Sequence, residues 1–228
     1  MEPDNLPDIL ELLKRTKTSP ILTNPSTSMK WLLAHHGIKQ EGEIIINRED
    51  RMALATAAVL LRADIEEVVQ HLNWKDFEGF VARILVENNY SCVESFRRRG
   101  NAEIKGMEID VIGLKNRTLL VIDAKMWGVR SGKASALRTA IDKQKERTDR
   151  LSNQLDRLAK KMTKLKAGTY ELLPIMVTWL VEDIEIHEGV PVVPIFLLNS
   201  FLLNIADYED LIDSFKGHLS DHYDQQTL

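Results

Sequence analysis

Two neighbouring strand-like segments, residues 107–113 and 118–125, constrain the fold more than any other feature of the chain. Only the polar connection Leu114–Arg117 separates them, which is typical of a β-hairpin. Charged residues interrupt both apolar runs at alternating positions. Because side chains in a strand alternate between two faces, the pattern predicts one apolar and one polar face on each strand.

The segments around this hairpin predict an α/β protein. A helix is expected from Trp74, with apolar residues at helical spacing, followed by a β-segment at 90–96 and a turn at Arg97–Gly100. After the hairpin we expect a helix over 133–166, buried strands at 173–181 and 190–198, and a terminal helix through about Phe215. The order is helix, three strands, helix and two strands, which contains an αβββαβ core and implies a mixed central sheet flanked by helices.

The predicted helix over 133–166 carries one regular stripe. Its members recur at alternating steps of four and three residues: Leu137, Ile141, Gln144, Thr148, Leu151, Leu155, Leu158, Met162 and Leu165. A helix of that length extends about 50 Å and would overhang a small domain. A coiled-coil-like contact with a protein partner or with a second copy is therefore one expectation.

The first 73 residues predict a small helical appendage, so we expect a helical region at 1–73 and a second domain at 74–228. Candidate N-caps precede three helical patterns: a residue of the segment Ser26–Ser28, Asn47 and Asp64. The single cysteine, Cys92, excludes a disulfide framework and a Cys-rich metal site. With no apolar stretch near the roughly 20 residues of a membrane span, we expect a cytoplasmic protein without membrane contact.

The charge is divided unevenly along the chain. Residues 97–166 carry 19 Lys and Arg against 8 Asp and Glu, whereas residues 167–228 carry 1 against 11. A basic block of this kind suggests a polyanionic partner such as nucleic acid. A solvated, charged helix surface explains the same excess without any partner.

Acidic and basic residues occupy the polar face of the hairpin. Asp110 on the first strand shares its side with Glu108, and Asp123 shares its side with Lys125 on the second. If the strand register joins the two polar faces, Asp110, Asp123 and Lys125 converge. Two such carboxylates suit Mg²⁺ or Mn²⁺, and a divalent cation with a neighbouring lysine suits phosphodiester hydrolysis.

The sequence Gly106-Met107-Glu108-Ile109-Asp110-Val111-Ile112-Gly113, followed by Leu120-Val121-Ile122-Asp123-Ala124-Lys125, resembles the PD-(D/E)XK nuclease motif. Together with the preceding Trp74–Phe80 segment and the order of elements, it is most similar to the Mrr-like restriction-endonuclease and archaeal Holliday-junction-resolvase branches. The resemblance covers about residues 74–200 and implies a restriction-endonuclease-like core. It departs from the pattern in two places: Ile109 stands where a proline is usual, and the second acid is Asp rather than the commoner Glu.

The resemblance also implies roles for individual residues. It makes Asp110 and Asp123 direct metal ligands, Ala124 a ligand through its backbone carbonyl, and Lys125 the cation that positions the attacking water. Glu78 matches the acidic residue that often completes the metal site, and Gln144 lies where many relatives place a Gln or Lys near it. Taken alone, Glu78 is also compatible with a solvated helix face, and Gln144 with a polar break in the stripe.

Basic residues around the motif are candidates for phosphate contacts, the main sequence-independent source of nucleic-acid affinity. The candidates are Arg97, Arg98, Arg99, Arg138, Lys143, Arg147 and Arg150. For Arg97, Arg98 and Arg99 the alternative is a turn that only adds solubility. The acidic residue Glu108 either adds a metal ligand or, as we favour, lies at the rim of the sheet.

These features predict an Mg²⁺- or Mn²⁺-dependent endonuclease that hydrolyses DNA, with a homodimer expected because cutting two strands commonly calls for two sites. The alternative is a nucleic-acid-binding or scaffolding protein that has a nuclease-like fold and does not cleave. A third interpretation is a helix-mediated interaction protein with an incidental pair of acids.

Overall fold

The structure is a computed structural model, and it describes residues 6–100, 106–126, 133–182 and 185–220 of the chain. The chain forms two compact units, an N-terminal unit, Met1–Phe80, and a C-terminal unit, Val81–Leu228. The boundary falls inside helix α5 (Trp74–Glu87). None of the described helices is long and apolar enough to cross a membrane.

The N-terminal unit is mainly helical, as the sequence predicts. Each expected N-cap is confirmed: Ser26 accepts the N–H of Met29, Asn47 forms a capping box with Asp50, and Asp64 caps the next helix. Such caps satisfy backbone N–H groups that have no partner within the helix. The elements are α1 (Leu6–Arg15), β1 (Ile21–Leu22), α2 (Thr27–His35), β2 (Ile44–Ile45), α3 (Arg48–Leu60), α4 (Ile65–Gln70) and the start of α5.

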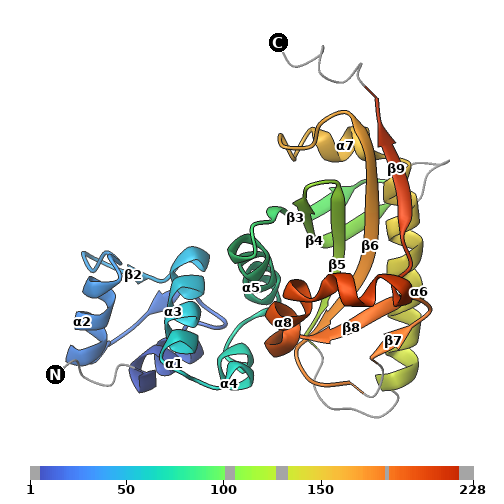
Figure 1. Cartoon of the computed structure of the whole chain (residues 1–228). Coiled ribbons are helices and arrows are strands. Elements are labelled where there is room, and N and C mark those ends of the chain that lie inside the picture. Colours follow the sequence, from blue (N-terminus) through green and yellow to red (C-terminus); the bar gives the residue numbers. More distant parts are fainter. Residues whose placement is uncertain (1–5, 101–105, 127–132, 183–184, 221–228) are drawn as a thin grey trace. The chain divides into compact units, whose positions relative to one another are not determined.

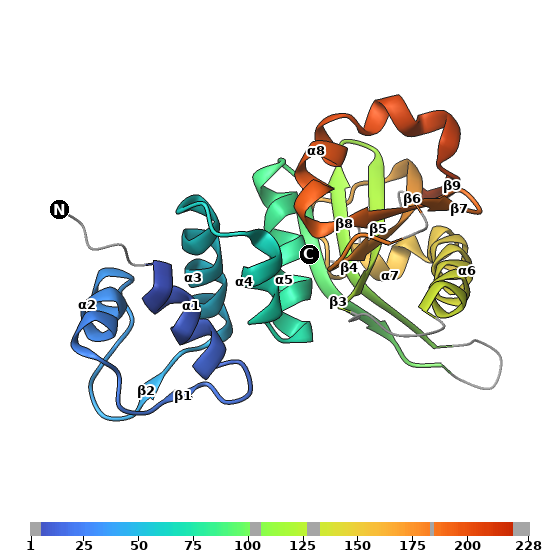
Figure 2. The same cartoon turned by 90° about the horizontal axis from the view of Figure 1, so that it is seen from below.

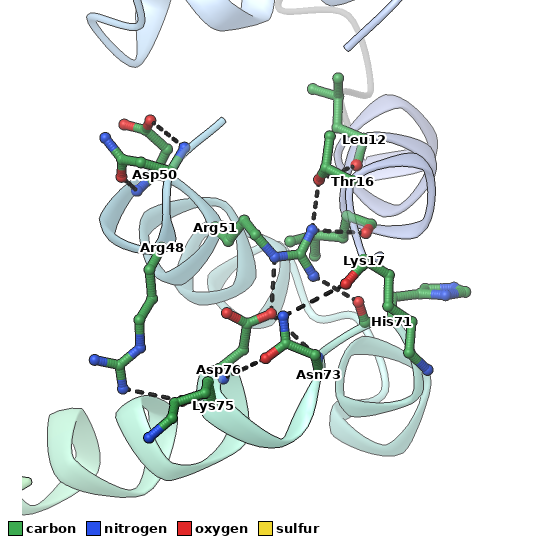
Figure 3. A network of polar contacts seen from close by, with 12 residues as sticks. Leu12, Thr16, Lys17, Arg48, Asp50, Arg51, His71, Asn73, Lys75 and Asp76 are labelled. Carbon is green, nitrogen blue, oxygen red and sulfur yellow. Dashed lines mark hydrogen bonds and ion pairs between the residues drawn. The ribbon is translucent and has the colours of Figure 1, made fainter. Parts of the chain in front are cut away.

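A buried arginine joins the helices of this unit (Figure 3). The guanidinium of Arg51 on α3 donates to the carboxylate of Asp76 at 2.8 Å, and the two side chains are only 4% and 3% exposed. It also donates to the backbone carbonyl oxygens of Leu13 at 2.8 Å and His71 at 2.7 Å, where α1 and α4 end. Because those carbonyls are among the groups a helix leaves unpaired, one side chain satisfies the ends of two helices.

Replacing Arg51 with methionine is expected to destabilise the N-terminal unit by about 3–5 kcal/mol, the usual effect of removing one partner of a buried ion pair. The Asp76 charge and two helix ends would lose their partner together. Urea unfolding followed by circular dichroism measures the loss. Lys14→Met, which removes an exposed ion pair with Glu11, is the control and should change stability by less than about 1 kcal/mol. A similar small change for Arg51→Met would contradict this role.

The described residues of the C-terminal unit form a seven-stranded mixed sheet with the order β3-β4-β5-β6-β8-β7, and β9 also pairs with β6 (Figures 1 and 2). Neighbours β3, β4 and β5 are antiparallel, whereas β5, β6 and β8 are parallel. The expected α/β class, with a mixed central sheet flanked by helices and a helical N-terminal region, is confirmed. The strands are β3 (Ser91–Arg98), β4 (Met107–Lys115), β5 (Thr118–Lys125), β6 (Gly168–Thr178), β7 (Ile186–His187), β8 (Val190–Pro194) and β9 (Phe215–Leu219).

The expected helix over 133–166 is two helices, α6 (Lys133–Ser152) and α7 (Leu155–Ala159). The break follows from local competition, because the Ser152 and Asn153 side chains both donate to the Asp149 carbonyl oxygen. All nine members of the stripe are buried. Its apolar members pack against the sheet of their own unit, so the stripe is core and the predicted 50 Å overhang is wrong.

The end of the chain also differs from the expectation of a terminal helix. Helix α8 (Leu198–Leu203) ends at Asn204, a 3₁₀ segment covers Ile205–Leu211, and β9 then pairs antiparallel with Gly168–Leu172 of β6. Gly217 is required where β9 crosses α6, since a Cβ there would lie 2.5 Å from the Ser152 carbonyl oxygen. Strand β9 begins at Phe215, where the expected helix ended, and its residues alternate in burial with a period of two.

Candidate active site at the end of the hairpin

The predicted hairpin forms, and its regular pairing ends where the acids begin. Strands β4 and β5 pair from Lys115 and Thr118 to Val111 and Ile122. The pairing of β3 with β4 omits one position, Ser95 opposite Asp110, and Ser95 has a φ of 49°. Strand β3 also extends through Arg98, so the predicted turn at Arg97–Gly100 is wrong for its first half.

Strict alternation, as predicted for β4, does not hold across Asp110. Ile109 and Ile112 are three residues apart, which would place them on opposite faces of a regular strand, yet both belong to the same core cluster. Phe96 of β3 joins that cluster too, and Val93 packs against it, so both strands change face at this position. An irregularity of this kind is a common way to re-aim a side chain next to a functional site.

The Asp110 carboxylate links β4 to β5 beyond Val111 and Ile122, the last pair of the regular strand register. Its Oδ2 accepts a hydrogen bond from the Ala124 N–H at 2.8 Å. Burial raises the pKa of Asp110 above its ordinary value, and repulsion from Asp123 raises this pKa further. The Ala124 hydrogen bond and the charges of Lys125 and Arg147 act in the opposite direction. The side chains of Asp110, Asp123, Lys125 and Arg147 thus form one electrostatic cluster.

Asp123 is the most deeply buried acid of the cluster, with a side chain only 1% exposed. Its Oδ2 lies 2.6 Å from the ammonium of Lys125, and its Oδ1 lies 2.8 Å from the guanidinium of Arg147 on α6. A carboxylate at this depth is stable only when opposite charges or hydrogen bonds compensate for lost water. The predicted convergence of Asp110, Asp123 and Lys125 is therefore present, with Arg147 as a fourth member.

The carboxylate oxygens of Asp110 and Asp123 suit a hard divalent cation that keeps part of its water shell. Mg²⁺ is commonly held by one or two carboxylates together with water and substrate phosphate. Asp123 Oδ2 is buried with the ammonium of Lys125 as its partner at 2.6 Å, and a carboxylate oxygen with one partner keeps a second lone pair for a cation. Among the residues that the structure describes, no three His, Cys, Asp or Glu side chains converge on one point. Any cation here would rest on Asp110, Asp123 and non-carboxylate oxygens.

Gln144 lies beneath this cluster and is fully buried. Its Nε2 donates to the Val121 carbonyl oxygen at 2.6 Å, and its Oε1 is buried without a hydrogen bond from the described residues. Thr148, one turn later, donates to the Gln144 carbonyl oxygen. Gln144 therefore attaches α6 to β5 two residues before Asp123.

The other two candidate acids have partners of their own. Glu78 belongs to the N-terminal unit, where its side chain is 7% exposed and lies 3.6 Å from the Lys75 ammonium. It is buried, in contrast to the alternative of a solvated helix face. Glu108 lies at the rim of the sheet and forms an ion pair with Arg97 at 2.6 Å, with both side chains about half exposed.

The candidate phosphate-binding residues are distributed over several surfaces. Arg98 donates to the Gln154 side chain at 2.7 Å, while Arg99 and Arg138 are exposed. Lys143, Arg147 and Arg150 line a groove of about 680 Å³ together with Lys125. This groove runs beside the acidic cluster between α6 and the ends of β4 and β5. It brings together three of the seven candidates.

The sequence prediction missed the contact of Arg147 with Asp123. It assigned this residue to substrate phosphate, and that assignment stays a prediction. The sequence held one signal for this contact. Arg147 follows Gln144 by three residues and so lies next to it on the helix, and Gln144 was already predicted to lie near the acids.

Comparisons with known proteins leave the family open. No model of a known protein family matches the chain. An uncharacterized protein of Archaeoglobus fulgidus is 29% identical over 137 residues, which make up 60% of this chain and 95% of that protein.

Three solved structures show only remote likeness. Protein VC1899 from Vibrio cholerae has a TM-score of 0.35 and 14% identity, with 91% of this chain and 51% of that chain covered. Protein AF1548, of unknown function, has a TM-score of 0.31 and 16% identity over 54% and 58% of the two chains. Can2 from Sulfobacillus thermosulfidooxidans, in complex with cyclic tetra-adenylate, has a TM-score of 0.34 and 14% identity over 88% and 51%. The chain spans about half the length of these structures, and at such TM-scores the likeness supports no argument about the site.

Asp110→Asn is expected to stabilise the protein at neutral pH in the absence of divalent cations. Because the folded-state pKa of Asp110 is raised above 3.8, the folded protein binds more protons than the unfolded chain between the two values. Wild-type stability therefore falls as pH rises through that range, and the asparagine variant avoids this loss. We expect a Tm higher by a few degrees at pH 7, since ~1 kcal/mol corresponds to roughly 2–4 °C at this length.

Thermal unfolding at pH 7 and near pH 4, in EDTA, checks this expectation. The gain should shrink at the lower pH, where the wild-type carboxyl is increasingly protonated. Asp149→Asn, at an exposed position of α6, is the control and should give no comparable gain at either pH. An Asp110→Asn variant less stable than the wild type at pH 7 would show that burial and repulsion from Asp123 do not outweigh the Ala124 hydrogen bond and the charges of Lys125 and Arg147.

Proposed function

We propose that the chain is a metal-dependent endonuclease that hydrolyses phosphodiester bonds of DNA. One observation carries the proposal: two carboxylates and a lysine, on adjacent strands of a mixed sheet, gather beside a groove lined by basic side chains. Buried charges at such positions contribute little as packing, because their burial costs several kcal/mol unless they are compensated. The raised pKa of Asp110, in contact with two side chains that line the groove, Lys125 and Arg147, is a further property typical of functional sites.

In this proposal each residue has a definite task. Asp110, Asp123 and the Ala124 carbonyl oxygen would hold Mg²⁺ or Mn²⁺, and the cation would supply stabilisation of the negative charge that develops on the phosphate. Lys125, whose side chain is 23% exposed, is close enough to Asp123 to present its ammonium to an attacking water in the groove. Lys143 and Arg150 bind the phosphates on either side, a contact that positions the strand without reading its sequence.

Gln144 acts on the site through the strand rather than on the substrate. Its hydrogen bond to Val121 fixes α6 against β5, which sets where Asp123 and Lys125 lie relative to the groove. We assign it as a positioning residue. Glu78 belongs to the N-terminal unit, so completion of the metal site, the role that the PD-(D/E)XK resemblance implies for it, stays a prediction.

The alternative function is nucleic-acid binding without cleavage. One observation favours it: Lys125 and Arg147 already compensate the charge of Asp123, so the cluster is stable as a structural ion-pair network. The two functions differ in whether phosphodiester bonds are broken.

Lys125→Met should reduce DNA cleavage at least about 10²-fold while DNA affinity changes little, since a positioned proton-handling group typically contributes 10²–10⁴. The assay follows supercoiled plasmid, branched DNA and single-stranded RNA with Mg²⁺, with Mn²⁺ or with EDTA. Lys125→Met leaves Asp123 paired with Arg147 and is therefore the gentler variant; Asp123→Asn should abolish cleavage. Arg157→Met, at an exposed position of α7, is the control for loss of one positive charge. Metal-independent binding with no cutting by any sample would replace this proposal by the alternative.

A further inference from the structure

Arg147 connects the acidic cluster with the groove. Its guanidinium lies 2.8 Å from Asp123 Oδ1 and donates to the Glu108 carbonyl oxygen at 3.1 Å, so it touches both strands that supply the acids. Its side chain is 18% exposed and lines the groove with Lys143 and Arg150. The same side chain therefore borders a buried carboxylate and the surface on which a phosphate would lie.

The cluster is electrically balanced as it stands. Asp110 and Asp123 contribute two negative charges when ionised, and Lys125 and Arg147 contribute two positive charges. Both oxygens of Asp123 lie within ion-pair distance of a cation, Oδ2 near Lys125 and Oδ1 near Arg147. A divalent cation bound here while both basic groups stayed in place would leave an excess of positive charge in a largely buried site, which is unfavourable at low dielectric.

Arg147 is the partner that can leave. Lys125 follows Asp123 by two residues on the same strand, so its backbone holds it near that carboxylate. Arg147 reaches Asp123 from a different element, and its long side chain already borders open space in the groove. A phosphate oxygen is an equivalent acceptor for a guanidinium, since both acceptors form charge-assisted hydrogen bonds with it.

We propose that Arg147 exchanges between two anionic partners: it neutralises Asp123 in the metal-free protein, and it moves to a substrate phosphate when a divalent cation occupies the carboxylates. This inference rests on the proposed function, because it requires that the cluster bind a divalent cation. The exchange couples the two ligands. Metal binding releases the group that grips the phosphate, and a bound phosphate stabilises the position of Arg147 away from the acids.

Two expected effects follow from this exchange. In Arg147→Met, Mn²⁺ no longer competes with a guanidinium for the Asp123 carboxylate. This variant should therefore bind Mn²⁺ about 5-fold or more tightly than the wild type, a factor at the low end of those typical for coupled binding sites. The gain in DNA affinity on adding Ca²⁺ should also be smaller in Arg147→Met than in the wild type by a similar factor. Ca²⁺ serves here as a hard cation bound by oxygen ligands.

The experiment measures both affinities on the full chain. Isothermal titration gives the Mn²⁺ affinity, and fluorescence anisotropy of a labelled duplex gives the DNA affinity in EDTA and in Ca²⁺. Arg147→Gln is a second variant that removes the charge and keeps a donor for the Glu108 carbonyl oxygen. Asp123→Asn should lose Mn²⁺ binding, which ties the signal to this site.

Arg150→Met is the matched control. Arg150 lines the same groove one turn along α6, donates to the Gly106 carbonyl oxygen at 3.4 Å and lies 3.8 Å from Glu146. Its loss should weaken DNA binding while changing Mn²⁺ affinity less than twofold.

The outcomes separate this inference from the proposed function. Tighter Mn²⁺ binding in both Arg147 variants, with little change in Arg150→Met, supports the exchange. Equal Mn²⁺ affinities in the wild type, the Arg147 variants and Arg150→Met overturn the exchange and leave the metal site standing. An equal increase in the Arg147 and Arg150 variants also overturns it, because loss of local positive charge then explains the effect. Absence of Mn²⁺ binding in every protein overturns the metal site and this inference together.

Discussion

Burial of the Asp123 carboxylate is the constraint on which the rest of the site depends. A negative charge that is 1% exposed must be compensated inside the protein, and its two partners come from different places. Lys125 is supplied by the next position on the same face of β5, whereas Arg147 requires that α6 lie across the sheet. The buried stripe of α6 and the hydrogen bond from Gln144 to Val121 fix that helix in place. Core packing and site electrostatics are thus parts of one arrangement.

Buried charge is used in two different ways in this chain. In the N-terminal unit, Arg51 pairs with Asp76 and also satisfies backbone carbonyl groups at two helix ends, so its donors have acceptors on every side (Figure 3). A network of that kind adds rigidity and leaves nothing for a ligand. Around Asp123, by contrast, Gln144 Oε1 is buried without a hydrogen bond among the described residues, and Asp123 Oδ2 has the ammonium of Lys125 as its partner at 2.6 Å. This network borders an open groove through Lys125 and Arg147, whereas the Arg51 network is closed on itself.

Much of this arrangement could be predicted from the sequence, because it depends on local periodicity. The hairpin, the three N-caps and the buried stripe each follow from spacing that covers only a few residues, and Asp123 and Lys125 share a face for the same reason. Three features could not be predicted in this way. The change of face at Asp110 depends on both β3 and β4, the break after Ser152 on side-chain hydrogen bonds, and β9 on a partner strand far earlier in the chain. Tertiary context decides each of these.

The basic block of the sequence also acquires a different meaning in the structure. Its excess positive charge suggested a polyanionic partner, yet several of its members form ion pairs within the protein. Arg97 pairs with Glu108, Lys145 with Asp213, and Arg147 with Asp123. The potential that a phosphate would meet is therefore set by the charged groups that line the groove, which include Glu108 and Glu146 beside the basic residues, and the net charge of the segment overstates it. If Arg147 is held by Asp123 until a cation arrives, the positive potential of the groove becomes a property of the metal site as well as of the sequence.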